Sequence, residues 1–191
     1  MKTPHILIIR FSAMGDIAMT VPIVYSFAKQ YPDLRISVLS RPFAQPFFQH
    51  LAPNVDFMAA DLKEEYKGFR GLNALYRRLV AKQFTAVADF HNVLRTRYLR
   101  LRFLLDGKSV AHINKHKQGK KLLCREENKV FIQQPTSFQN YADVLEALGY
   151  PIKPEFTSIF PTEGGDLQLL PNIIGVKQPA ERWIGIAPFA A

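Results

Sequence analysis

The segment His5–Gln30 constrains the fold of this chain more than any other part of the sequence. It opens with the apolar run His5–Ile9, which has the length of a β-strand, and it continues through a short loop to a helical pattern over Ile17–Gln30. A strand, a loop and a helix in this order form the first crossover of a parallel α/β sheet, in which ligands bind at the carboxyl ends of the strands. Asp16 stands at the mouth of the helix, directly after Gly15.

Two interpretations of Asp16 are open. Aspartate is a preferred N-cap residue, so its side chain would merely satisfy the first backbone N–H groups of the helix, and its position alone favours this role. Alternatively, a carboxylate that faces the crevice at the strand ends can accept a proton from a substrate hydroxyl. Gly15 would then let the ligand approach the backbone closely.

The rest of the chain continues the alternation of strand and helix. Strand patterns occur at 34–39, 55–58, 85–89 and 109–113, helical patterns at 41–51, 69–82, 92–105 and 137–148, and a lysine-rich loop at 115–121. This alternation predicts an α/β fold with a Rossmann-like, mostly parallel sheet and helices on both faces.

A domain boundary is predicted near the end of the sequence. Residues 162–182 contain paired glycines and two prolines, and Trp183–Pro188 has the pattern of a new strand, which needs neighbours on both sides. We expect residues 1–161 to form one Rossmann-like domain, 162–182 to be an interdomain linker, and 183–191 to begin a truncated second domain. The alternative is that the last strand lies at the edge of the first sheet.

Composition narrows the class of partner but does not choose one. The 191 residues carry a formal charge of +9, which indicates an anionic partner: nucleic acid, an anionic membrane surface, or a phosphorylated substrate. The single cysteine, Cys124, excludes an internal disulfide and fits a reducing, cytoplasmic location. His112 and His116 lie near it in sequence without a pattern that would converge on a metal, so we expect no metal site.

A second polar segment, Asp89–Arg97, also lies where a predicted strand ends and a helix begins. His91 and Asn92 can hydrogen-bond a polyol, and Arg95 offers a planar fork that suits phosphate or carboxylate. The first turn of the following helix presents unpaired N–H groups, which favour anions. The alternative is a structural role, in which Asp89 and Asn92 cap the helix. Arg95 and Arg97 are then simply solvated.

The loop Lys115–Lys121 can bind phosphates or an anionic lipid surface, although such lysine runs are more often simply solvated. No P-loop occurs, and Gly15 lacks the other glycines of a dinucleotide fingerprint, so no cofactor is expected. Nucleic-acid binding is not favoured, because the aromatic residues follow helix spacing and are expected in the core rather than among the basic residues.

Two stretches resemble the motifs of a known family. Residues 9–22 resemble the opening motif of glycosyltransferase family 9, the heptosyltransferases of lipopolysaccharide inner-core biosynthesis and their relatives. The matching positions are Ser12, Met14, Gly15, Asp16, Thr20 and Pro22. Asp89–Arg97 is similar to the second motif of this family, and Ile184–Pro188 to the first strand of its C-terminal domain.

The resemblance implies a GT-B fold, in which two Rossmann-like domains face each other across a cleft. It implies an inverting transferase that needs no metal, with a phosphorylated, lipid-linked saccharide acceptor on the N-terminal half and a nucleotide-sugar donor such as ADP-heptose on the other. Asp16 would be the catalytic base. The substrate-binding residues would be Ser12, Met14, Gly15, His91, Asn92, Arg95, Arg97, Lys115 and Lys117.

The expected function is therefore that of a heptosyltransferase-like enzyme in the cytoplasm, with peripheral contact to an anionic inner membrane. The chain is expected to be the acceptor-binding part of such an enzyme and to be inactive without a donor domain. One alternative is a non-catalytic basic module that binds RNA or a membrane surface. Another is an inactive truncated product.

Overall fold

The computed structural model describes residues 3–158, 175, 177–178, 180–184 and 186. The chain divides into two compact units, Met1–Thr157 and Ser158–Ala191. All helices and strands of the described residues belong to the first unit.

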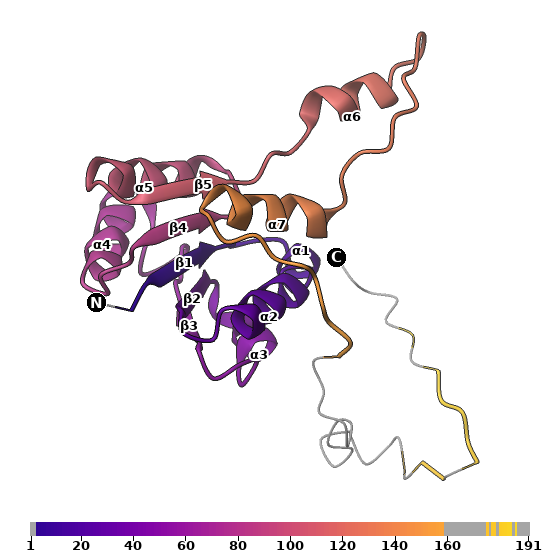
Figure 1. The fold of residues 1–191 in the computed structure, drawn as a ribbon, viewed down its shortest axis with the longest axis horizontal. Coiled ribbons are helices and arrows are strands. Elements are labelled where there is room, and N and C mark those ends of the chain that lie inside the picture. Colours follow the sequence, from indigo (N-terminus) through magenta and orange to yellow (C-terminus); the bar gives the residue numbers. More distant parts are fainter. Residues whose placement is uncertain (1–2, 159–174, 176, 179, 185, 187–191) are drawn as a thin grey trace. The chain divides into compact units, whose positions relative to one another are not determined.

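A five-stranded, all-parallel sheet forms the centre of the first unit (Figure 1). Its strands are β1 (His5–Ile9), β2 (Arg35–Ser40), β3 (Val55–Ala59), β4 (Ala86–Asp89) and β5 (Ser109–His112), in the spatial order β3-β2-β1-β4-β5. The strand order reverses between β1 and β4, where open α/β sheets bind ligands at the carboxyl ends of the strands. Ile9 pairs with Asp89 across this boundary, so the loops that follow the two strands lie side by side.

Helices cover both faces of the sheet, which confirms the predicted fold class. One face packs against α1 (Met14–Ala18), α2 (Val21–Gln30), α3 (Gln45–Phe48) and α7 (Ser137–Ala147), and the other against α4 (Gly68–Val80) and α5 (Leu94–Leu105). The short 3₁₀ helix η1 (Pro42–Ala44) precedes α3.

The central strand supplies both hydrophobic cores. Ile6 and Ile8 of β1 point to one layer of helices, and Leu7 and Ile9 point to the other. All five residues of β1 are buried, as expected for a parallel strand that is covered on both faces.

Two local predictions are wrong. The helical pattern over Ile17–Gln30 is divided between α1 and α2, because the Thr20 hydroxyl donates to the Ile17 carbonyl and Pro22 has no N–H to continue the helix. The predicted loop 115–121 contains most of α6 (Lys117–Leu123), whose lysines, glutamine and leucines are good helix formers.

The predicted linker and second-domain strand fall mainly outside the described residues. Residues 162–174, 176 and 179 of the linker are not described, nor are 185 and 187–191 of the strand. The boundary between the two compact units falls at Thr157, and the assignment of a second domain stays a prediction.

Candidate functional site

Arg10 organises the carboxyl edge of the sheet. It follows β1 directly and is 8% exposed, so its guanidinium group needs partners within the protein. Nη1 donates to the Phe90 carbonyl at 2.6 Å, Nε donates to the Ser12 carbonyl at 2.9 Å, and Nη2 forms an ion pair with the Asp16 carboxylate. One buried cation therefore joins the loop after β1, the loop after β4 and the first turn of α1.

Asp16 presents a half-exposed carboxylate at this edge, since 54% of its side chain is accessible. It is not the N-cap, which is Ala13; Asp16 occupies the third helical position, and its Oδ2 accepts a hydrogen bond from the Ala13 N–H at 3.4 Å. The structural role that the sequence suggests is therefore present in a modified form. An exposed carboxylate oriented by a buried cation can also accept a proton from a ligand.

Helix α7 packs through Tyr141 against Phe90, which follows β4, and against α1. The Tyr141 ring stacks on Phe90 with 4.8 Å between ring centroids, and its hydroxyl donates to the Asp16 carbonyl at 3.4 Å. The Arg10 guanidinium lies 5.8 Å from the Tyr141 ring centroid, within range of a cation–π contact. These contacts of Tyr141 hold Phe90, the Asp16 backbone and Arg10 against α7.

His91 and Ser12 meet across the boundary between the two loops. Ser12 Oγ and His91 Nε2 lie 3.2 Å apart in a hydrogen bond. The His91 ring is 8% exposed, and its buried Nδ1 has no hydrogen-bond partner within the described residues. Burial, together with the positive charges of Arg10 and Lys115, lowers the pKa of His91 to about 4. At neutral pH the ring is therefore uncharged and acts through hydrogen bonding, not as a cation.

Asp89 shapes the loop that carries His91. It is fully buried, and its Oδ1 accepts hydrogen bonds from the backbone N–H groups of His91 at 2.9 Å and Asn92 at 2.8 Å. Its Oδ2 forms an ion pair with Arg100 Nη1 at 2.9 Å. Asp89 therefore holds the loop and does not cap α5, whose N-cap is Val93.

Asn92 has a positive φ of 48° and both ends of its amide engaged. Its Nδ2 donates to the Ile113 carbonyl at 3.0 Å, and its Oδ1 accepts from Arg97 Nε at 2.9 Å. Asn92 thus bridges the loops after β4 and β5 and orients Arg97 at the start of α5.

A small cavity of about 160 Å³ opens between these loops and adds basic groups to the site. Ser12 and His91 line it together with three cations, Arg41, Lys63 and Arg95. Lys115 belongs to the same electrostatic environment, because partial burial and the nearby charge of Arg10 lower its pKa. Lys117 begins α6 and is exposed.

Gly15 and Met14 lie at the open side of α1, and Met14 is 59% exposed. A Cβ atom on Gly15 would meet no atom of the described residues within 4 Å, and the backbone there does not require glycine. The fold itself therefore gives no reason for glycine at this position.

The structure thus brings together Ser12, Asp16, His91 and Arg95, with Lys115 coupled to them through its charge. It adds Arg10, Arg41, Lys63 and Tyr141, which were not predicted as site residues. A charged residue directly after a buried strand was a signal for Arg10. No local signal points to Tyr141, because it reaches the site from α7.

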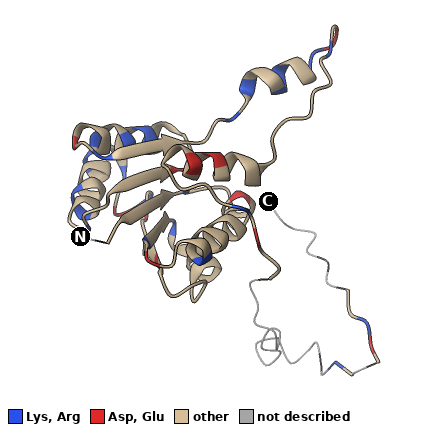
Figure 2. Ribbon diagram, viewed as in Figure 1, with Lys and Arg blue, Asp and Glu red and all other residues tan. Residues whose placement is uncertain are grey.

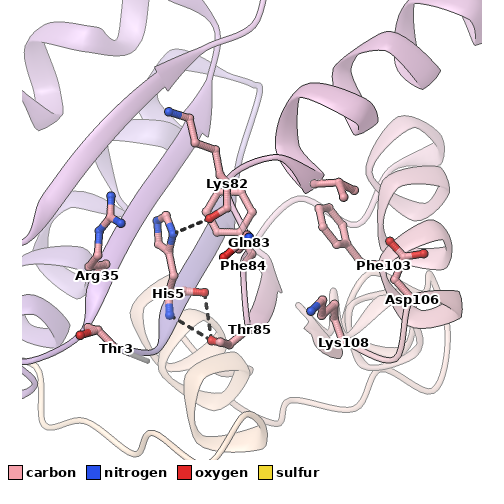
Figure 3. A pocket seen from close by; sticks show the side chains of 11 residues that line it. Thr3, His5, Arg35, Lys82, Gln83, Phe84, Thr85, Phe103, Asp106 and Lys108 are labelled. Atoms are coloured by element: carbon pink, nitrogen blue, oxygen red, sulfur yellow. Dashed lines mark hydrogen bonds between the residues drawn. The ribbon is translucent and has the colours of Figure 1, made fainter. Parts of the chain in front are cut away.

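Another pocket lies at the opposite, amino end of the sheet. It has a volume of about 660 Å³ and is lined by His5, Arg35, Lys82 and Lys108 among others (Figure 3). His5 there is engaged through both ring nitrogens, with Ser37 Oγ at 2.8 Å and the Lys82 carbonyl at 3.2 Å. Both ring nitrogens of His5 are therefore occupied by hydrogen bonds within the protein. The candidate functional site is the one at the carboxyl edge of the sheet.

Among the described residues, no group of three His, Cys, Asp or Glu side chains could hold a metal ion. A search of the same residues finds no helix with the length and apolar character of a membrane span.

No protein-family model and no curated protein matches the sequence. Solved structures do match the fold. A glycosyl transferase family 9 protein from Veillonella parvula DSM 2008 is 20% identical over 83% of this chain and 47% of its own, with a TM-score of 0.57. The E. coli heptosyltransferase WaaC with ADP is 18% identical over 81% of this chain and 50% of its own, with a TM-score of 0.54.

At this level of identity the two matches show a shared fold. The predicted likeness to family 9 glycosyltransferases is confirmed at the level of structure, over about four fifths of the chain. The chain spans about half the length of each of these solved structures.

The protonation of His91 gives a first test of this geometry. Its ring should titrate near pH 4 and not near its ordinary value of 6.5, as followed by NMR of the imidazole protons and assigned with His91→Gln. The unfolded chain takes up this proton near pH 6.5 and the folded chain only near pH 4. The free energy of unfolding should therefore fall as the pH is lowered through this interval, and less so in His91→Gln. Titration at or above the ordinary pKa would contradict the buried, neutral ring.

The ion pair between Asp89 and Arg100 gives a second test. Arg100→Met leaves a fully buried carboxylate with only its two backbone partners, so the free energy of unfolding should fall by about 3 kcal/mol in urea titrations. Arg77→Met, at an exposed position of α4, is the matched control and should change it by less than about 0.5 kcal/mol. Equal effects of the two changes would show that the pair does not hold the His91 loop.

Proposed function

We propose that this chain is the acceptor-binding part of an inverting, heptosyltransferase-like glycosyltransferase. The observation that carries the proposal is Asp16: a half-exposed carboxylate at the carboxyl edge of the central strands, oriented by the buried Arg10. The fold shared with two solved glycosyltransferase structures supports the reaction class. The resemblance of residues 9–22 to the family 9 motif supports the role of the carboxylate.

In the proposed reaction, a hydroxyl oxygen of the acceptor attacks the anomeric carbon of a nucleotide-sugar. The bond from that carbon to the diphosphate oxygen breaks as the new glycosidic bond forms, so the configuration inverts. Asp16 accepts the proton of the attacking hydroxyl. Arg10 is a positioning residue, because its guanidinium holds the carboxylate toward the edge of the sheet.

The acceptor is proposed to be a phosphorylated, lipid-linked saccharide such as lipopolysaccharide inner core. Arg95, Arg97, Lys115 and Lys117 would supply positive charge for its anionic groups. Neutral His91 and Ser12 would hydrogen-bond its hydroxyls, Gly15 and Met14 would border the space it enters, and Asn92 would act through Arg97. The site would face the cytoplasmic side of the inner membrane.

The donor is proposed to be a nucleotide-sugar such as ADP-heptose. It would bind mainly to residues that correspond to the half of the solved structures that this chain does not span, and the chain alone would be inactive in transfer.

Acceptor binding and proton transfer can be tested separately through Asp16. The 191-residue chain should bind a deacylated, phosphorylated inner-core oligosaccharide in calorimetric titrations, and Asp16→Asn should bind it nearly as well. When the chain is joined to a donor-binding domain, Asp16→Asn should lower turnover by about 10²–10⁴-fold, the usual contribution of a general base.

Asp33→Asn is the matched control for this test, since Asp33 is an exposed acid in the turn before β2. It should leave both acceptor binding and turnover unchanged. Near-normal turnover of Asp16→Asn would contradict the base assignment, whereas absence of oligosaccharide binding would contradict the acceptor site.

A further inference from the structure

Helix α5 turns apolar side chains outward as well as inward. It packs on the sheet through Thr96, Leu99 and Phe103, which are buried. Leu94, Leu101 and Leu105, spaced seven and four residues apart on the opposite side of the helix, are 81%, 54% and 74% exposed. A helix that only covers a core carries polar residues on its outer side, so these leucines have no role in the fold of the described residues.

The exposed leucines continue into a groove between α4 and α5. Its volume is about 430 Å³, and its lining includes Phe69, Leu72, Leu94, Tyr98, Leu101 and Arg95. Phe69 is 71% exposed and contacts the Tyr98 ring edge to face, with centroids 5.0 Å apart. We call the exposed residues Phe69, Arg70, Arg77, Leu94, Leu101 and Leu105 together with this groove the α4–α5 face.

The charged residues within α4 and α5 are all basic, and the acid that follows Leu105, Asp106, accepts a hydrogen bond from the Tyr76 hydroxyl. The sequence of α4 contains three arginines and that of α5 contains four, and neither helix contains an aspartate or glutamate. Figure 2 shows basic positions along both helices, in contrast to the acidic positions on α7. Arg70, Arg77 and Arg95 are exposed and form no ion pair with other described residues.

We propose that the α4–α5 face binds an anionic lipid surface. Exposed leucine and phenylalanine side chains on two helices that carry arginines and no acids fit a bilayer surface, where apolar groups enter the acyl boundary and arginines meet anionic headgroups. A second copy of the chain fits poorly, because a symmetric contact would place arginines against arginines. Nucleic acid would pair with the arginines but leave the leucines in water.

The face adjoins the candidate site. The helices α4 and α5 begin at the carboxyl edge of the sheet, and Arg95 lines both the groove and the small cavity beside His91. A lipid surface on the groove therefore lies next to the loops that carry the Asp16 site. This proposal does not depend on sugar transfer, because lipid binding requires neither donor nor acceptor.

Vesicle co-sedimentation of the 191-residue chain tests the proposal. The chain should bind vesicles of phosphatidylcholine with about 30% phosphatidylglycerol and bind pure phosphatidylcholine at least about tenfold more weakly, and added salt should weaken binding. Leu101→Ser with Leu105→Ser should lower affinity about tenfold or more. Arg70→Gln and Arg77→Gln should each lower it about fivefold.

Matched controls separate this face from other surfaces. Lys29→Gln removes one exposed charge from α2 on the opposite layer, and Phe131→Ser removes an exposed apolar side chain after α6; neither should alter binding. Asp16→Asn should bind vesicles as the unaltered chain does, whatever its effect on transfer. No binding to anionic vesicles, or loss of binding in Phe131→Ser but not in the leucine variant, would overturn the proposal.

Discussion

The buried guanidinium of Arg10 is the interaction on which the carboxyl edge of the sheet depends. A cation that is 8% exposed is stable only with several hydrogen bonds and a counter-ion. Arg10 obtains these from two backbone carbonyls and from Asp16, which belong to three different segments. Burial of the charge therefore constrains the loop geometry, since movement of one loop would remove one of the three partners of the cation.

Asp89 is a second buried charge, of opposite sign, whose partners also fix a loop. Its carboxylate is fully buried and is satisfied by two backbone N–H groups and by Arg100. Because β1 and β4 are neighbours in register, these two buried charges lie at adjacent strand ends and fix adjacent loops. Uncharged His91 lies between the loops, hydrogen-bonded to Ser12, and adds no further positive charge to be neutralised.

The sequence was sufficient for most elements of the fold and for the likeness to family 9, but only for part of the site. Strand patterns in the sequence locate every strand of the sheet. The central strands β1 and β4 are buried throughout and read as apolar runs, whereas the edge strands β3 and β5 are partly exposed. The spatial order of the strands depends on where the crossover connections place them, and no local sequence pattern encodes it. The same is true of Tyr141, which contacts Asp16 from 125 residues further along the chain, and of the double engagement of Asn92, which depends on the position of β5.

Packing within the fold requires glycine at position 71 but not at position 15. A Cβ on Gly71 would collide with the backbone of Tyr66, so packing accounts for that glycine. Around Gly15 there is open space and no unusual backbone angle. Side chains of increasing size at position 15 would therefore report how closely a bound molecule approaches the loop, separately from any effect on folding. This makes the open side of α1 a place where the dimensions of the site can be measured one methylene group at a time.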